Sequence, residues 1–200
     1  LFGARQRSAG VVIFEGEEVA FSSPREAIEK GMALVPEDRK AQGLILGLGG
    51  RHNTTLPHLN RFSKLGIPNV KQELAVFNEY KEKLEIKTTG PEQLVGDLSG
   101  GNQQKFVLAK WLCADPKLII LDEPTRGIDV GSKSAIHQYI AELAERGLAV
   151  IVISSEMPEV IGVSHRILTM ASGRLVGEFS GAEMTEQNLI TAVSVLPKAS

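Results

Sequence analysis

Short apolar runs separated by polar, glycine-containing stretches predict alternating strands and helices along this chain of 200 residues. Met32 to Val35, Leu118 to Leu121 and Leu148 to Ile153 have the length of strands, and we predict that the last two are buried. A continuous apolar run fits a strand that is covered on both faces of a parallel sheet. Because ligands of such sheets bind at the carboxyl ends of the strands, the residues that follow these runs are candidates for chemistry.

Two pairs of shorter apolar runs predict hairpins, each with four residues between its strands. The first pairs Val11 to Phe14 with Val19 to Phe21, as an antiparallel sheet at an edge of the domain. The second pairs Arg166 to Met170 with Leu175 to Phe179.

Three helices are indicated by caps and apolar spacing. Ser23 and Glu26 are the N-cap and N3 acid of a capping box, and Gly31 ends the short helix that they begin. An amphipathic helix is predicted from Ser134 to Arg146. Thr185 to Val193 are predicted to form a terminal helix, followed by a disordered Pro-Lys-Ala-Ser end.

Periodicity weakens from Ala41 to about Pro91, where we predict a small helical subdomain. Its histidines, His52 and His58, do not have the spacing of metal ligands. A charged run in this region is predicted to be the solvated face of a helix: Lys71, Glu73, Glu79, Lys81, Glu82, Lys83 and Glu85.

Composition narrows the class of protein. Hydrophobic residues make up 42% of the chain, enough for a sizeable core in one domain with a subdomain. The 22 Lys and Arg nearly balance the 24 Asp and Glu, which argues against bulk electrostatic binding of nucleic acid. Cys113 is the single cysteine, so an internal disulfide is excluded, and we expect a buried thiol in a reducing compartment. Each apolar run falls far short of the ~20 residues of a membrane helix.

Two strings carry the candidate chemistry. The string Leu98 to Lys105 begins a helix with Ser99, Gly100 and Gly101, so that backbone N–H groups at the positive end of the helix dipole can face a phosphate. Taken alone, this string is as well explained by an ordinary helix cap. In the second string, Asp122 and Glu123 follow an apolar strand, where Asp122 would hold Mg²⁺ and Glu123 would orient water.

These strings, together with the Asp129 that follows them, resemble ATP-binding cassette ATPases over nearly the whole chain. In that family LSGGQ is the signature motif, the Asp-Glu pair closes the Walker B strand and the next aspartate forms the D-loop. LSGGNQQK, LDEPTRGIDVG, ALVPEDRK and ISSEMPEV look more narrowly like the second cassette of the tandem ATPases that power bacterial monosaccharide importers. The resemblance implies an α/β fold of the P-loop, RecA-like type with a mostly parallel sheet, an antiparallel edge subdomain and a helical signature subdomain.

Three departures from the cassette pattern bear on catalysis. The sequence contains no Gly-Lys dipeptide, so the phosphate-cradling Walker A loop is absent, and we expect the chain to begin just after it. Glu37 stands at the Q-loop position, where a carboxylate adds negative charge beside phosphate. Ser155 stands at the position of the switch histidine, and a hydroxyl cannot become a cation near neutral pH. Autonomous hydrolysis by this chain is therefore not expected.

The resemblance implies a mechanism in which two cassettes pair head to tail around ATP. Ser99, Gly100 and Gly101, with Gln103 nearby, would complete the ATP site of an upstream or partner cassette, while Asp122 and Glu123 would face a second site. The expected cofactors are ATP and Mg²⁺. Two other classes stay open: a non-transport cassette ATPase that acts on ribosomes or DNA, and a catalytically silent regulatory cassette.

The resemblance also implies an organisation and a setting. We expect one partial ATPase domain, with the β subdomain and Q-loop strand in residues 1–40, the helical subdomain and signature in 41–113, and the Walker B core and C-terminal segment in 114–200. Partners would be membrane permease subunits and, indirectly, a sugar-binding protein, without nucleic acid. The expected location is the cytoplasmic side of the bacterial membrane.

Overall fold

The computed structural model of this protein describes residues 1–64 and 66–194, so the predicted disordered end at residues 197–200 lies outside the described part. Contacts divide the chain into two compact units, Leu1–Ile151 and Val152–Ser200. Across the described residues, no helix has both the length and the apolar character needed to cross a bilayer.

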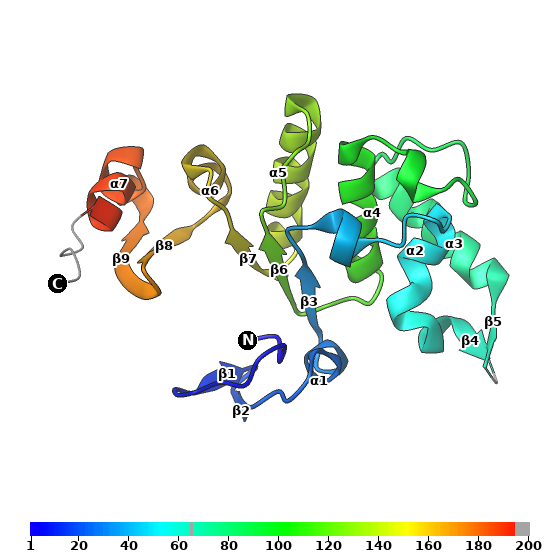
Figure 1. Ribbon diagram of the computed structural model, residues 1–200, viewed down its shortest axis with the longest axis horizontal. Helices are drawn as coiled ribbons and strands as arrows, with labels where there is room; N and C mark the ends of the chain where they lie inside the picture. The colour runs from blue at the N-terminus through cyan, green and yellow to red at the C-terminus, as the bar shows by residue number, and fades with distance from the viewer. Residues whose placement is uncertain (65, 195–200) are drawn as a thin grey trace. The chain divides into compact units, whose positions relative to one another are not determined.

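The central sheet has three strands in the order β3-β6-β7: β3 Met32–Val35, β6 Leu118–Asp122 and β7 Ala149–Ile153. The first unit ends within β7, after Ile151. β3 and β6 are parallel, with Val35 opposite Leu121 (Figure 1). Both strands therefore leave the sheet at the same edge, as expected for a ligand site. Residues 118–121 are buried, which confirms the prediction for that run.

The predicted burial of the run Leu148 to Ile153 is wrong. β7 begins at Ala149 and alternates exposed with half-buried residues, and Ile151 and Ile153 are 37% and 49% exposed. β7 is the last strand in the sheet order of the described residues. An apolar run predicts a strand, but whether other elements cover both faces of that strand depends on the rest of the fold.

The N-terminal hairpin consists of β1 Val12–Phe14 and β2 Glu17–Val19, paired antiparallel. Its connection is shorter than predicted, with only Glu15 and Gly16 between the strands. Both residues have positive φ angles, 52° and 80°, which match the twist of a tight hairpin turn.

Helix α1, Pro24–Glu29, begins where the sequence predicts, because the Ser23 side chain accepts a hydrogen bond from the Glu26 backbone N–H (3.4 Å). The reciprocal half of the capping box is displaced by one residue. The Glu26 carboxylate accepts from the backbone N–H and hydroxyl of Ser22, at 2.9 and 2.5 Å. α1 is followed directly by β3, to which it packs through Ala27.

Three helices gather beside the sheet: α2 Gly50–Thr55, α3 Val70–Lys83 and α4 Gly100–Leu112 (Figure 1). Phe77 of α3 stacks on Phe106 of α4 with ring centroids 6.1 Å apart. Gly50 lets α2 approach these rings, because a Cβ there would lie 2.5 Å from Phe106. The remaining elements of this group are short: a π-helical turn Arg39–Gly43, 3₁₀ segments Leu56–Phe62 and Val95–Asp97, and a hairpin of β4 Ser63–Lys64 and β5 Ile67–Pro68.

One residue of the charged run in α3 contradicts the predicted solvated face. Glu73 is only 2% exposed, because its carboxylate accepts from Arg51 Nη1 and from the Thr55 hydroxyl, each at 2.7 Å. Both donors belong to α2, and Arg51 is itself 8% exposed. The charge pair is therefore part of the α2–α3 interface.

The remaining elements complete both units. Helix α5, Val130–Glu145, starts four residues before the predicted Ser134, because Asp129 caps it. The second unit contains α6 Met157–Val163, β8 Arg166–Ala171, β9 Arg174–Ser180, a 3₁₀ turn Gly181–Glu183 and α7 Glu186–Ser194. β8 and β9 form the predicted hairpin, again with a two-residue turn instead of four residues.

Candidate nucleotide site

The two acids that close β6 stand on a sharply turned backbone. Asp122 is the last residue of the strand, and Glu123 has a φ of 47°, in the left-handed region that residues with a side chain rarely adopt. The turn is closed by a hydrogen bond from the Arg126 backbone N–H to the Glu123 carbonyl oxygen (3.1 Å). Backbone strain of this kind gathers at functional sites. The sequence predicts the two acids, but nothing in it signals this conformation.

The surroundings of Asp122 disfavour the charged form of its carboxyl group. Burial and, secondly, the neighbouring charge of Glu123 raise the pKa of Asp122 above its ordinary value. A bound cation would offset both effects, and carboxylate oxygen is a ligand that Mg²⁺ prefers. Within residues 1–64 and 66–194 no group of three or more His, Cys, Asp or Glu side chains is arranged to hold a metal. The residues fit a Mg²⁺ ion held through one or two carboxylates together with phosphate and water oxygens.

The signature string begins helix α4 as predicted. Ser99 is the N-cap, and its hydroxyl oxygen accepts from the backbone N–H of Asn102 (3.5 Å) and from Asn102 Nδ2 (2.9 Å). The first backbone N–H groups of a helix have no acceptor within the helix, so those of Gly100 and Gly101 begin α4 at its positive end. This geometry suits a phosphate oxygen.

Close packing gives the two glycines a second role, which the sequence pattern does not predict. A Cβ on Gly100 would lie 3.1 Å from the carbonyl oxygen of Gly127, and one on Gly101 would lie 2.1 Å from the hydroxyl oxygen of Ser132. The start of α4 therefore lies directly against the loop that follows β6 and against the first turn of α5. Side chains larger than hydrogen are excluded at Gly101 unless Ser132 moves.

Asp129, the predicted D-loop residue, lies beside the same glycines and holds Ser132 in place. Its carboxylate accepts from the Ser132 backbone N–H (2.9 Å) and hydroxyl (2.8 Å), and these bonds lower the pKa of Asp129. As the N-cap of α5, it fixes the start of that helix. The structure thus brings Ser99, Gly100, Gly101 and Asp129 together.

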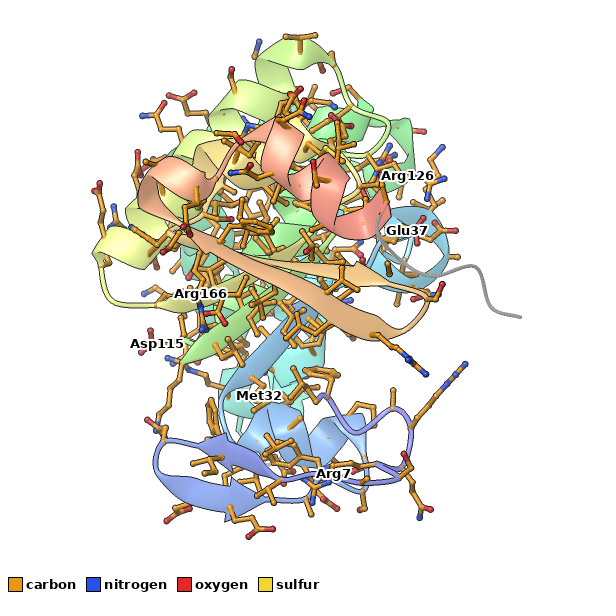
Figure 2. The ribbon with its side chains drawn as sticks, turned by 90° about the vertical axis from the view of Figure 1, so that its left-hand side faces the viewer. Arg7, Met32, Glu37, Asp115, Arg126 and Arg166 are labelled. Atoms are coloured by element: carbon orange, nitrogen blue, oxygen red, sulfur yellow. The ribbon has the colours of Figure 1, made fainter. Side chains whose placement is uncertain are left out.

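Glu37 follows β3 at the same sheet edge as Asp122. Its carboxylate forms an ion pair with Arg126, and the two side chains lie next to each other in Figure 2. Both side chains are substantially exposed, at 46% and 65%. The pair connects the predicted Q-loop position to the loop after β6 and reduces the net charge that Glu37 brings to the site.

Gln103, which is buried, and Arg39, which is half-buried, join these loops. Gln103 is 3% exposed, and its side-chain amide donates to the carbonyl oxygen of Val95 (3.1 Å). Arg39 donates from Nε to the Gln103 side-chain oxygen (3.4 Å) and from its other nitrogens to the loop after β6. Gln103 is therefore a packing residue behind the helix start. Arg39 stands in the string ALVPEDRK, but no spacing in the sequence marks it.

Ser155, the predicted switch position, follows β7 and belongs to the second unit. The structure places it between β7 and the start of α6 at Met157. Its proposed part in a nucleotide site stays a prediction. Cys113, expected to be a buried thiol, is 7% exposed, which confirms that prediction.

Known proteins resemble this chain in sequence and in fold. Residues 1–126 match the family described as ABC transporter. A ribose import ATP-binding protein of Roseobacter denitrificans is 47% identical over 95% of this chain and 37% of its own length. A second, from Rhizobium meliloti, is 46% identical over 97% of the chain and 39% of its own length. The chain thus spans less than two fifths of the length of these relatives.

Solved structures agree on the fold. A nucleotide-free ATP-binding cassette from an ABC transporter superposes with a TM-score of 0.79 at 22% identity, over 98% of this chain and 77% of the other. A dimeric cassette with bound ADP and phosphate gives 0.73 at 20% identity, over 88% and 75%. The fold is that of an ATP-binding cassette, with its parallel sheet, antiparallel strands and helices. On the family match and this fold, the chain belongs to the ABC transporter family.

Proposed function

We propose that this chain forms part of the ATP-hydrolysing subunit of a sugar importer. Through its signature motif it completes the ATP site of a partner cassette. The observation that carries the proposal is the start of α4. Ser99 caps the helix. Gly100 and Gly101, which have no space for a side chain, let the start of the helix pack closely against Gly127 and Ser132, on either side of Asp129 in the sequence. The 47% identity to a ribose import ATP-binding protein supports a sugar as cargo.

In this arrangement the residues act by binding and orientation. The N–H groups at the start of α4 would stabilise charge on the terminal phosphate of ATP held by the partner cassette, as donors fixed in place before the reaction do. Asp122 would hold Mg²⁺ at the chain's own site, where the ion neutralises phosphate charge. Glu123, on its turned backbone, would orient water there. Permease subunits and a sugar-binding protein complete the proposed importer at the cytoplasmic face of the membrane.

A complementation experiment tests the proposal. The matching segment of the Roseobacter denitrificans relative is replaced by this chain, and ATP turnover and ribose uptake of the chimaera are measured with its permease. Ser99→Arg should reduce turnover by roughly a hundredfold, since it removes a transition-state contact and fills the helix start. Ser8→Arg, at an exposed serine, is the matched control. Turnover that is equal in the two variants contradicts the in-trans role.

A catalytically silent cassette is the second candidate, favoured by the ion pair that occupies Glu37. Glu123→Gln in the same chimaera separates the two. If Glu123 orients water, turnover should fall by about a hundredfold or more at the site that this chain serves. Unchanged turnover with Glu123→Gln, together with its loss in Ser99→Arg, identifies a silent cassette that contributes only its signature motif.

A further inference from the structure

Hydrogen bonds from one arginine join three segments that lie far apart in the sequence. Arg39 begins the π-helical turn that follows the Glu37 position. Its Nη1 donates to the carbonyl oxygen of Arg126 (2.9 Å) and its Nη2 to that of Gly127 (3.2 Å). Its Nε donates to the side-chain oxygen of Gln103 (3.4 Å). One guanidinium thus bonds both the loop after β6 and the first turns of α4.

The turn that carries Arg39 is itself fixed on α4 at both ends. At the far end, Lys110 Nζ donates to the carbonyl oxygen of Gly43 (2.8 Å). Gln103 and Lys110 are seven residues apart, so they lie two turns apart on one face of the helix. Between these two residues in the sequence, Val107 packs closely against the turn: a Cβ on Gly43 would lie 3.0 Å from Val107 Cγ2. Arg39 is therefore mounted on α4 and reaches across to the other loop.

The guanidinium of Arg39 also lies close to Gly100 of the signature motif. A Cβ on Gly100 would lie 2.8 Å from Arg39 Nη2. A cation next to the start of a helix opposes the helix dipole, so the dipole does not account for the arginine at this place. The two carbonyl oxygens of Arg126 and Gly127 do, because a planar guanidinium donates to both at once.

We propose that Arg39 is a positioning residue that links the two nucleotide sites served by this chain. Its bonds hold the loop after Asp122 and Glu123, which face one site, against the helix start at Ser99, which faces the other. A shift of the loop that carries Glu37 is thereby transmitted to both. The inference rests on the proposed function for the meaning of the two sites, but the linkage itself is a property of this chain alone.

Amide hydrogen exchange of the 200-residue chain tests the linkage without nucleotide or partner. In Arg39→Ala, exchange should become roughly tenfold faster in peptides that cover residues 123–131 and 99–104. Peptides from β3 and from residues 118–121 should exchange as before. Arg25→Ala is the matched control, because Arg25 is an exposed arginine that pairs with Glu29 on its own helix at 2.9 Å.

A second pair of variants separates a link from general loosening. Gln103→Met removes the Arg39 bond to α4, together with the Gln103 bond to the Val95 carbonyl oxygen, and leaves the two carbonyl bonds of Arg39. Residues 99–104 should therefore lose protection while residues 123–131 keep it. In the double variant, Arg39→Ala with Gln103→Met, the increase in amide exchange at residues 99–104 should be smaller than the sum of the increases in the two single variants. Arg39→Lys, which keeps the charge but cannot bond both carbonyls, should give an intermediate change at 123–131.

Three results overturn the proposal: exchange within twofold of the native chain in both peptides of Arg39→Ala, an equal rise that includes the β3 and β6 peptides, or strictly additive effects in the double variant. If Arg39→Ala does not fold, Arg39→Lys and Gln103→Met decide the question. Because no ATP is present, failure here leaves the proposed function standing. Failure of the ATPase chimaera likewise leaves the exchange result intact.

Discussion

Asp122 and Glu123 are adjacent carboxylates, and their coupling is measurable at the scale of single residues. Burial is the larger cause of the raised pKa of Asp122, and the charge of Glu123 is the smaller. Glu123→Gln should therefore lower the pKa of Asp122 but leave it above the ordinary value. Titration of the side-chain carboxyl by ¹³C NMR measures this. A pKa that does not move, or that rises, contradicts the coupling.

The sign of this coupling also predicts a dependence of stability on pH. A carboxyl whose pKa is raised in the folded state stabilises the fold below its unfolded pKa, and this contribution is lost as the pH rises through the folded value. Because Glu123→Gln removes one cause of the raised pKa, the variant should lose less stability when Asp122 ionises. The difference in unfolding free energy between Glu123→Gln and the native chain should therefore move in favour of the variant as Asp122 ionises, which urea unfolding across this pH range checks.

Gly101 gives a prediction that depends on packing alone. Gly101→Ala places a methyl group 2.1 Å from the Ser132 hydroxyl oxygen, and we expect a loss of about 1–3 kcal/mol in unfolding free energy. Adding Ser132→Gly removes both the hydroxyl and its Cβ, so the double variant should recover most of the effect of Gly101→Ala. The measurement is urea unfolding of four chains. Strictly additive losses contradict the close contact.

At the scale of elements, the α2–α3 interface depends on a buried ion pair. Glu73→Ala leaves Arg51, which is 8% exposed, without its closest carboxylate, and we expect a loss of about 3–5 kcal/mol. Glu79→Ala in the same helix is the control: it breaks the exposed pair of Glu79 with Lys83 and should change stability by at most about 1 kcal/mol. Equal losses in the two variants contradict this account.

The hydrogen bond between Arg51 and Glu92 should make the stability of the chain sensitive to acid. This bond lowers the pKa of Glu92. A lowered carboxyl pKa contributes stability that is present above the unfolded value and is lost as the pH falls through the folded one. The native chain should therefore exceed Glu92→Gln in stability near pH ~7 and lose that advantage below pH ~4. An advantage that persists in acid contradicts the assignment.

Local patterns predicted most elements, and long-range contacts account for the failures. Caps and apolar spacing predicted α1, α5 and α7, and paired apolar runs predicted both hairpins. The burial of Glu73 could not be predicted, because its partner Arg51 lies 22 residues away on another helix. The acids after β6 and the helix start at Ser99 were predicted from motifs. The link through Arg39 was not, since its acceptors are 64 to 88 residues distant.

At the scale of the whole molecule, the exposed apolar side chains of β7 should affect self-association in solution. Ile151 and Ile153 are 37% and 49% exposed on a strand at the end of the sheet order. Apolar edge strands pair with other chains. We expect the isolated chain to self-associate with rising concentration, and Ile153→Lys to weaken that association, as measured by light scattering after size exclusion. Association that is unchanged by Ile153→Lys assigns the contact to another surface.

Cys113 makes this protein convenient for site-specific labelling. The thiol is buried, and burial raises its pKa to about 12, so almost none of it is the thiolate that reacts with maleimides near neutral pH. A cysteine introduced at an exposed position such as Arg126 would therefore be modified in preference to the native one. Spin labels or fluorophores could follow the loop after β6 without first removing the natural cysteine.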